Sequence, residues 1–201
     1  MEREPPIPGR TPLDDTSGLR DRSIRTRADL YEREAENIRK AVMKYLAATP
    51  TTRSARFDVP WLRRLHREML GDVWEWAGAI RKREMNIGSP PHSIESELEQ
   101  LAQDLKEWER SGMPIVEQGV CLHHRAVGIH PFRDGNGRWA RLLANIWLKM
   151  HGAAPVIWPE ENIGGESTIR SEYLAAMKAA DRGDLKPLTR LHEKHSERES
   201  Y

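Results

Sequence analysis

Apolar residues recur at helical spacing along most of the chain. Between Ser93 and Arg110, for example, Leu98, Leu101 and Leu105 stand three or four positions apart, which predicts one long helix. The same pattern, with capping residues before it or Gly and Pro after it, predicts six more helices, near residues 26–49, 58–73, 116–129, 138–152, 169–177 and 184–191. The chain is therefore expected to be all-α in fold class.

Two local patterns add detail to this helical plan. In the first helix, Thr26 and Asp29 form a candidate capping box, and Ile38 and Tyr45 are expected to face the core. The segment WEWAGAIRKREMNIGSPPH breaks the helical pattern with two glycines and a proline pair. It predicts one short β-hairpin over residues 79–87.

The length of 201 residues allows one sizeable core but not two full domains. Residues 1–25 mix Pro, Gly, Arg and Asp without periodicity, which indicates an extended N-terminal arm. Residues 26–195 are expected to form a single domain, and residues 196–201 a polar C-terminal tail. We find no internal repeat in the sequence.

Composition narrows the classes of partner. Lys and Arg number 32 against 31 Asp and Glu, so the formal charge is only +1, and a protein that holds nucleic acid through phosphates usually has a basic excess. No segment is apolar enough for a signal peptide or a membrane span, and the single Cys121 excludes an internal disulfide framework. The expectation is a soluble, cytoplasmic protein without a membrane or direct nucleic-acid partner.

The densest group of chemically active residues is HPFRDGNGR, residues 130–138. Glycines at 135 and 137 stand between two predicted helices, where backbone N–H groups can turn toward a ligand and the next helix offers its positive end. Arg138 and Arg141 are three residues apart at the start of that helix, and each guanidinium can bind phosphate oxygens in a bidentate fork. This part of the motif predicts an anion site.

The other charged side chains of the motif suit chemistry at a phosphate. A neutral His130 could take a proton from an attacking hydroxyl near pH 7, and Asp134 offers one hard oxygen ligand to a Mg²⁺ that phosphates share. Together these residues predict in-line attack on a metal-bound polyphosphate. A simple glycine cap is the alternative for the loop alone. A dinucleotide fingerprint over residues 135–140 is disfavoured because a helix, not a strand, is predicted before it.

The run closely resembles the Fic family signature, His-x-Phe-x-Asp/Glu-Gly-Asn-Gly-Arg-x-x-Arg, and meets it at every specified position from His130 to Arg141. Residues 76–94 look like the family's flap followed by the start of its next helix, and SEYLAAMKAADRGDLKPL looks like its C-terminal helices. The N-terminal stretch is most similar to Fic proteins of mobile elements that stand beside a helix-turn-helix partner. The resemblance implies a helical fold that transfers AMP from ATP to a Ser, Thr or Tyr hydroxyl of a target protein, with auto-modification as a further expectation.

The resemblance also implies a role for each motif residue. His130 would deprotonate the target hydroxyl, and Asp134 would bind Mg²⁺. The remaining positions would hold the nucleotide phosphates: the backbone of Gly135 and Gly137 with Asn136 at the α-phosphate, Arg138 at the β- and γ-phosphates, and Arg141 at the γ-phosphate. Relatives that transfer the γ-phosphate instead carry lysine at the second glycine, so Gly137 favours nucleotidyl transfer.

Two further expectations follow from the family pattern. The flap from Arg81 to Ile87 would pair with an extended target segment by strand addition. Many members also carry an inhibitory helix with the motif Ser/Thr-x-x-x-Glu-Gly/Asn, and here Glu36 followed by asparagine matches its end, although Glu32 occupies the Ser/Thr position. Glu36 is therefore a candidate inhibitor that would pair with Arg141.

Two other functions stay open at this point. The enzyme could use another donor, such as UTP or a nucleotide-linked alcohol, because the motif recognises phosphates and barely reads the base. Alternatively, the chain could be a regulatory or interaction protein that binds nucleotide without turnover. An inhibitory partner protein is a further possibility that the sequence leaves open.

Overall fold

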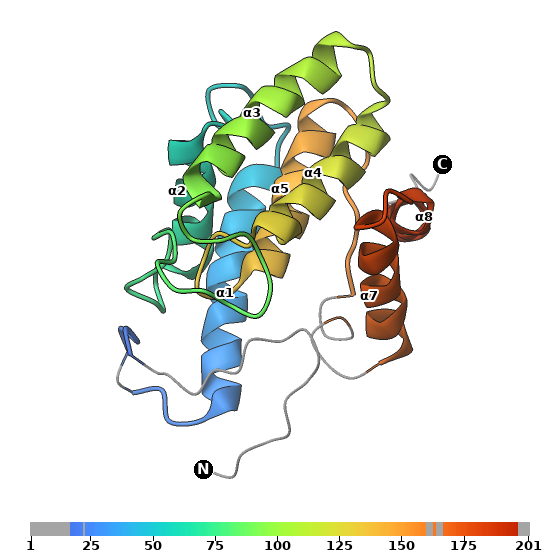
Figure 1. Ribbon diagram of the computed structural model, residues 1–201. Helices are drawn as coiled ribbons and strands as arrows, with labels where there is room; N and C mark the ends of the chain where they lie inside the picture. The colour runs from blue at the N-terminus through green and yellow to red at the C-terminus, as the bar shows by residue number, and fades with distance from the viewer. Residues whose placement is uncertain (1–16, 22, 160–162, 164–166, 197–201) are drawn as a thin grey trace. The chain divides into compact units, whose positions relative to one another are not determined.

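The computed structural model describes residues 17–21, 23–159, 163 and 167–196. Its named helices confirm an all-α fold: α1 Arg27–Leu46, α2 Val59–Leu70, α3 Ile94–Arg110, α4 Ile115–Ile129, α5 Asn136–Met150, α7 Thr168–Ala180 and α8 Lys186–His195 (Figure 1). The chain divides into two compact units, one from Gly18 to Pro155 and one that contains the residues from Val156 onward. The first unit holds α1–α5, and the second holds α7 and α8.

Side-chain caps set the starts of two helices in the first unit, α1 and α2. The Thr26 hydroxyl accepts a hydrogen bond from the Asp29 amide at 3.1 Å, and the Asp29 carboxylate accepts one from the Thr26 amide at 3.0 Å. This is a complete capping box. At α2 the Asp58 carboxylate accepts from the Trp61 amide at 2.8 Å, and Pro60 lies in the first turn, where its missing N–H costs nothing.

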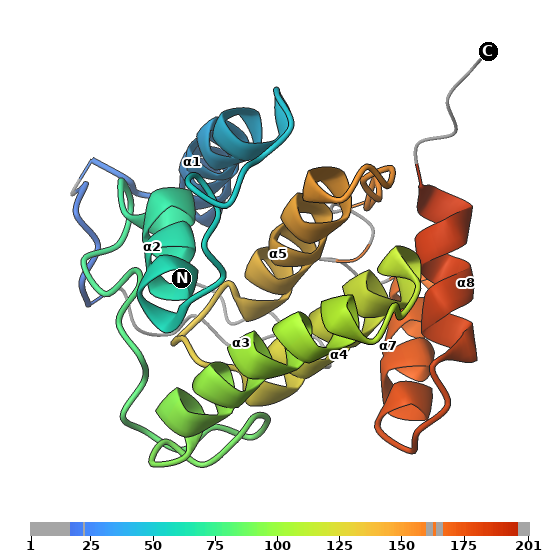
Figure 2. The ribbon, with the colours of Figure 1, turned by 90° about the horizontal axis from the view of Figure 1, so that it is seen from above.

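Helix α5 is the centre of the first unit. It packs against α1, α2 and α4, while α3 lies along α4 and also contacts α2 (Figure 2). Eleven of its 15 residues are buried, so it meets other helices on nearly every side. The largest fully buried side chains of the unit form one continuous set of aromatic and aliphatic groups: Trp61, Trp74, Trp139, Phe132, Leu62, Leu65, Met69, Leu70, Ile94, Leu98, Leu101 and Leu105.

The face that α1 turns to the core differs from the predicted one. Its buried residues are Leu30, Glu34, Asn37, Ala41 and Tyr45, whereas the side chain of Ile38, which was expected to face the core, is only partly covered. The expected stripe is therefore wrong by about one position, except at Tyr45. Hydrogen bonds explain why α1 is rotated about its axis relative to the prediction. The Asn37 side chain donates to the Glu68 carbonyl and accepts from the Asp72 backbone amide, each at 2.9 Å.

The segment between α2 and α3 does not form the predicted hairpin. Residues 79–92, which we call the flap, contain turns and bends but no strand. Their backbone bonds to the end of α4 instead: Arg81 N donates to Pro131 O at 3.0 Å, and Ser89 N donates to Ile129 O at 3.2 Å. Because these amides are used between segments, they are not available for cross-strand pairing within the flap.

The second unit is a pair of helices with its own small aromatic core. Trp158 packs edge-on against Tyr173 of α7 and His192 of α8, with ring centroids 5.9 and 5.0 Å apart. An isolated bridge joins Val156 to Ser196. Both helices stand where the apolar spacing predicts them.

Some of the predicted organisation lies outside the described residues. That applies to residues 1–16 of the expected N-terminal arm and to residues 197–201 of the polar tail. The described end of the arm pairs with the body, since Arg20 N donates to Val73 O at 2.9 Å and Glu75 N donates to Gly18 O at 2.8 Å. A single domain over residues 26–195 stays a prediction. Among the described helices, none is long and apolar enough to cross a bilayer.

Candidate active site

The HPFRDGNGR motif forms the tight connection between α4 and α5. His130 ends α4 with φ of 52°, and Gly135 precedes α5 with φ of 76°, so two left-handed residues bracket the loop. Glycine is required at 135, because a Cβ atom there would stand 2.6 Å from Leu70 Cδ1. A non-glycine residue at positive φ is strained by about 1–3 kcal/mol, and such strain is common at functional sites.

Phe132 and Asn136 close the loop on itself. The Asn136 side chain accepts from Phe132 N and donates to Phe132 O, each at 2.8 Å. Phe132 is fully buried, as expected for an anchor, and meets Trp139 edge-on at 5.1 Å. Because the Asn136 amide is bonded at both ends to backbone, its side chain shapes the turn. The first N–H groups of α5 have no acceptor within the helix, which suits an anion, and a contact of Asn136 with the α-phosphate stays a prediction.

His66 on α2 packs against the motif loop and supports it. The sequence pattern did not single out this residue. Its ring stacks on Phe132 with centroids 3.8 Å apart. Nδ1 accepts from Gly78 N and Nε2 donates to Asp134 O, each at 2.9 Å, which fixes the tautomer because an amide can only donate and a carbonyl can only accept. Burial lowers the pKa of His66 to about 3, so the ring is neutral. The one feature of the sequence that could have indicated this role is the position of a histidine within the apolar stripe of α2.

His130 lies with its imidazole largely covered. Nδ1 stands 3.4 Å from Val127 O, so Nδ1 carries the proton in the neutral ring and Nε2 keeps its lone pair. Burial lowers the pKa of His130 to about 4; the contact with Val127 opposes this shift, and the positive charge of Arg81 adds to it. At pH 7 the ring is therefore neutral and able to accept a proton.

At the start of α5, Arg138 joins two carboxylates. Its Nη1 lies 2.7 Å from Glu34 Oε2, and its Nη2 lies 3.7 Å from Asp134 Oδ2. Glu34 comes from α1 and is 2% exposed; its other oxygen accepts from Trp74 Nε1 at 2.7 Å. The Arg138 side chain itself is 28% exposed. One guanidinium expected at phosphates therefore already has an anionic partner, and solvent reaches it.

Arg141 turns back toward the same end of α5. It is buried, and its Nη1 would lie 3.3 Å from a Cβ atom placed on Gly137. A side chain at 137 would press on this guanidinium, so glycine keeps it close to the helix start. Two guanidinium groups and the positive end of the helix dipole thus lie near the motif loop, and this arrangement favours a polyanion.

The carboxylate of α1 that reaches the motif is Glu34 rather than Glu36. The Glu36 side chain is 42% exposed and pairs with its helix neighbours Arg33 at 3.5 Å and Lys40 at 3.9 Å. The buried stripe of α1 explains the difference, because it includes Glu34 but passes beside Glu36. An inhibitory role for Glu36 stays a prediction, and the geometry favours Glu34 for that role.

Comparison with known proteins identifies the region that contains this site. Residues 56–148 match the model of the Fic/DOC family. The chain contains a Fic domain. Protein adenylyltransferase fic-1 from Caenorhabditis briggsae is 41% identical over 140 residues, which cover 66% of this chain and 26% of that protein. Protein adenylyltransferase Fic from Drosophila ananassae is 33% identical over 154 residues, or 74% of this chain and 29% of the relative.

Solved structures show the same fold. Fic-1 (residues 134–508) from Caenorhabditis elegans has a TM-score of 0.71 and 28% identity, and the match covers 85% of this chain and 49% of that one. BepC from Bartonella tribocorum, solved with bound AMPPNP, has a TM-score of 0.68 at 21% identity and covers 93% of this chain and 96% of its own. The chain thus spans about a quarter of the length of the curated relatives that it matches.

Within this Fic domain, the two flap residues predicted to dock the target differ in their exposure to solvent. Arg81 is buried, and its guanidinium donates to backbone carbonyls, including His130 O at 2.7 Å. Ile87 is 45% exposed. Of the two predicted docking residues, Ile87 is therefore accessible to a target, whereas the Arg81 side chain is held inside.

Within the motif sequence itself, residues 130–141, Asp134 is the one carboxylate that could bind a metal ion. No cluster of three or more His, Cys, Asp or Glu side chains suitable for a metal occurs among the described residues. Asp134 is a hard oxygen ligand whose side chain is 23% exposed. A single carboxylate beside guanidinium groups fits a Mg²⁺ that arrives with a nucleotide and is shared with its phosphates.

Proposed function

We propose that this chain is a protein adenylyltransferase that transfers AMP from ATP to a Ser, Thr or Tyr hydroxyl of a target protein. The observation that carries the proposal is the arrangement around one tight loop: a neutral, buried His130 stands before it, and Arg138 and Arg141 follow it at the positive end of α5. The relatives named above support it, because they are adenylyltransferases with the same domain. The bound AMPPNP of BepC supports a nucleotide donor.

In this reaction His130 Nε2 accepts the proton of the target hydroxyl while the hydroxyl oxygen attacks the α-phosphorus of ATP. The bond between the α-phosphorus and the bridging oxygen breaks, and pyrophosphate leaves with the electron pair. AMP stays joined to the target through the new P–O bond, and the imidazolium later returns its proton to solvent. A positioned general base of this kind contributes about 10²- to 10⁴-fold in rate.

The other motif residues hold the leaving group and the reacting phosphate. The first N–H groups of α5 face the α-phosphate, and Arg138 and Arg141 bind the β- and γ-phosphates. Asp134 would hold a Mg²⁺, and this ion would supply positive charge that offsets the charge developing on pyrophosphate. The space at Gly137 suits nucleotidyl transfer, because a longer side chain there would displace Arg141.

The proposal includes a route for the target and a control on the donor. A target segment would lie along the flap near the exposed Ile87, with its hydroxyl directed at His130.

Glu34 is paired with Arg138, so ATP must displace this carboxylate before the β- and γ-phosphates can bind the guanidinium. A carboxylate that competes with phosphate in this way restrains the enzyme until nucleotide or a partner protein moves α1.

The test is transfer of label from ATP. The protein is incubated with Mg²⁺ and a cell extract, in parallel with ATP labelled at the α-phosphate and ATP labelled at the γ-phosphate. Adenylyl transfer labels the target, or the enzyme itself, only from the α-labelled donor, and intact mass then shows one added AMP. Label from the γ-phosphate, or tight ATP binding without any labelled protein, would contradict the proposal. Parallel reactions with UTP, GTP and CTP establish the base preference.

A further inference from the structure

Arg81 is a buried cation at the joint between the flap and the motif. It is 7% exposed, and its guanidinium donates to three backbone carbonyls: Nε to His130 O at 2.7 Å, Nη1 to Arg83 O at 2.9 Å, and Nη2 to Ser89 O. Its own amide donates to Pro131 O at 3.0 Å. One residue therefore ties together both ends of the flap and the beginning of the catalytic loop.

Arginine suits this place for a physical reason. Burial of a cation is costly unless its donors are satisfied, and the planar guanidinium has five N–H donors in a fixed fork. Here the fork meets carbonyls from three separate backbone positions, which a single ammonium group at the end of a lysine cannot span in the same geometry. Burial lowers the pKa of Arg81, but an arginine stays charged at neutral pH.

The backbone that Arg81 holds is the backbone of His130. That residue stands at φ of 52°, a conformation that a non-glycine side chain rarely adopts without support. The flap passes directly over it: a Cβ atom on Gly88 would lie 2.4 Å from His130 Cβ and 2.9 Å from Arg81 Nη2. The flap at Gly88 and the Arg81 hydrogen bond thus limit the backbone of His130 from two directions.

We propose that Arg81 is a positioning residue for His130: its guanidinium holds the flap against the start of the catalytic loop and fixes the imidazole where it meets the target hydroxyl. The kinetic part of this inference rests on the proposed adenylyl transfer. The structural part, that Arg81 fastens the flap, does not. In this arrangement Arg81 acts through the backbone of His130 and touches neither nucleotide nor target.

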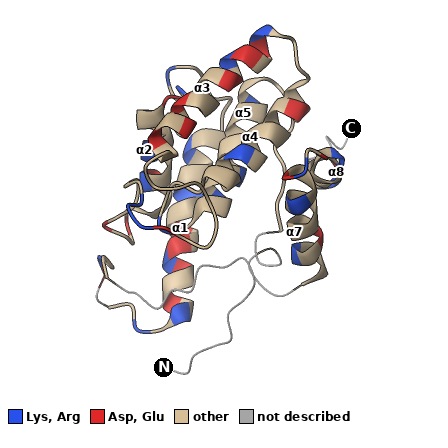
Figure 3. Ribbon diagram, viewed as in Figure 1, with Lys and Arg blue, Asp and Glu red and all other residues tan. Residues whose placement is uncertain are grey.

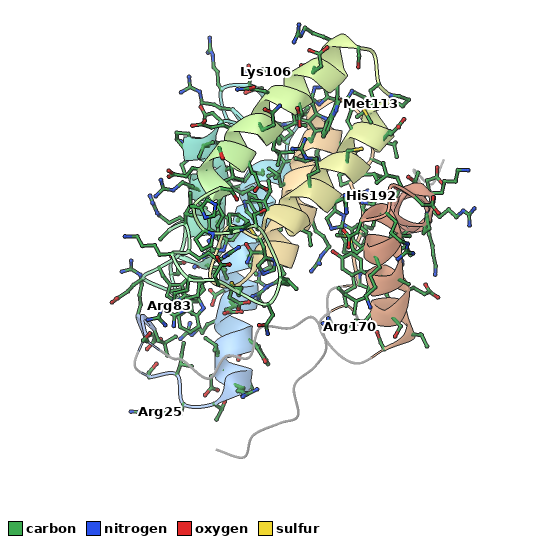
Figure 4. The ribbon with its side chains drawn as sticks, in the orientation of Figure 1. Arg25, Arg83, Lys106, Met113, Arg170 and His192 are labelled. Carbon is green, nitrogen blue, oxygen red and sulfur yellow. The ribbon has the colours of Figure 1, made fainter. Side chains whose placement is uncertain are left out.

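A matched control lies two residues along the same flap. The Arg83 side chain is exposed (Figure 4). Its contact with Arg81 uses only the backbone carbonyl of Arg83. Arg83→Met therefore removes the same charge from the flap as Arg81→Met while leaving the buried hydrogen bonds in place. Arg81→Lys serves as a second variant, which keeps the positive charge but loses the planar guanidinium that donates to three carbonyls at once.

The first measurement needs no activity. Amide hydrogen exchange of the nucleotide-free protein follows Arg81 N and Ser89 N, which bond to Pro131 O and Ile129 O. We expect both the Met and the Lys variant at 81 to speed exchange at these amides by about tenfold or more, while Arg83→Met leaves it unchanged. Unchanged exchange in Arg81→Lys would overturn the proposal, and if Arg81→Met does not fold, the Lys variant decides.

The second measurement separates positioning from binding. We expect Arg81→Met to lower kcat by about 10- to 100-fold with little change in the KM for ATP, because the phosphate ligands are untouched. The acid limb of the pH profile should also move to higher pH, since loss of a nearby positive charge raises the pKa of His130. Rescue of the Arg81→Ala variant by free guanidinium would support the assignment.

Each failure points to a different conclusion. If the wild-type protein transfers no AMP, the proposed function fails, and the exchange data alone decide whether Arg81 fastens the flap. If Arg81→Met raises the KM for the target while exchange stays as in the wild type, Arg81 contacts the target and the positioning role is wrong. Faster exchange at Arg81 N and Ser89 N in Arg83→Met, equal to that in Arg81→Met, would also overturn it, because the Arg83 variant keeps every buried contact.

Discussion

The two sides of the catalytic loop are held by different kinds of interaction. On the side of His130, the contacts are hydrogen bonds to backbone carbonyls and amides and aromatic packing, with His66, Phe132 and Arg81 all buried. On the side of the phosphates, Arg138 bridges two carboxylates and keeps part of its surface in solvent. We call these the base side and the phosphate side.

This difference matches what each side has to do. A general base must already point at its proton when the substrate arrives, so fixed, buried contacts suit it. A phosphate site must be vacated and filled in each turnover, and a carboxylate on a guanidinium can be exchanged for phosphate oxygens of the same charge type. The base side is therefore built for rigidity and the phosphate side for exchange. Both signs of charge are spread over the helices that surround the loop (Figure 3).

The largest effect should come from the base side. We expect His130→Ala to lower the rate of AMP transfer by about 10²- to 10⁴-fold and to leave ATP affinity nearly unchanged, because the imidazole meets the hydroxyl and not the phosphates. Rates of label transfer and calorimetric ATP binding measure the two quantities. The control is His92→Ala, which removes an exposed imidazole at the end of the flap. A His130→Ala variant that transfers AMP at the wild-type rate would show that another group takes the proton.

An intermediate effect should come from the exchange of anions at Arg138. Glu34→Gln keeps an oxygen for Trp74 Nε1 but removes the negative charge from the guanidinium. We expect ATP affinity to rise roughly tenfold, in the usual range for coupled equilibria. The same change at Glu36, which pairs with exposed Arg33 and Lys40, should alter affinity much less. If Glu36→Gln gives the larger gain, α1 inhibits the site through the residue that the family motif indicates.

The smallest effect should be the response of kcat to mild acid. Because burial lowers the pKa of His130 to about 4, the ring is neutral above that value and becomes protonated only as the pH falls through it. Lowering the pH from 7 to 5 should reduce kcat by only about a tenth, whereas with the ordinary histidine pKa of about 6.5 kcat would fall about 25-fold. The pH dependence of kcat, with circular dichroism to check folding, tests this. A large loss of kcat at pH 5 in the folded protein would mean that His130 is more solvated than the structure indicates.

Local signals in the sequence were sufficient for the helices and the motif. Thr26 with Asp29 and Asp58 with Pro60 start their helices as predicted, because a cap depends on residues only a few positions apart. Glycine at 135 is also a local signal, since it permits the left-handed turn that precedes α5.

Long-range contacts decided the rest. The rotation of α1 follows from hydrogen bonds of Asn37 to residues more than 30 positions away, and it selects Glu34 over Glu36 for the motif. The family pattern places Arg81 in a flap that docks the target, yet its guanidinium is buried and donates to carbonyls of the motif and of the far end of the flap, and the expected hairpin does not form.

The sequence by itself thus determined an α-helical protein with a phosphate-binding loop that bears a base, because helix period, caps and glycine turns act over a few residues. Only the tertiary structure decided which carboxylate faces Arg138, where His66 supports the loop, and that Arg81 points inward. Those outcomes depend on which polar groups meet after the helices pack, and a buried polar group must find its partner wherever the fold places one.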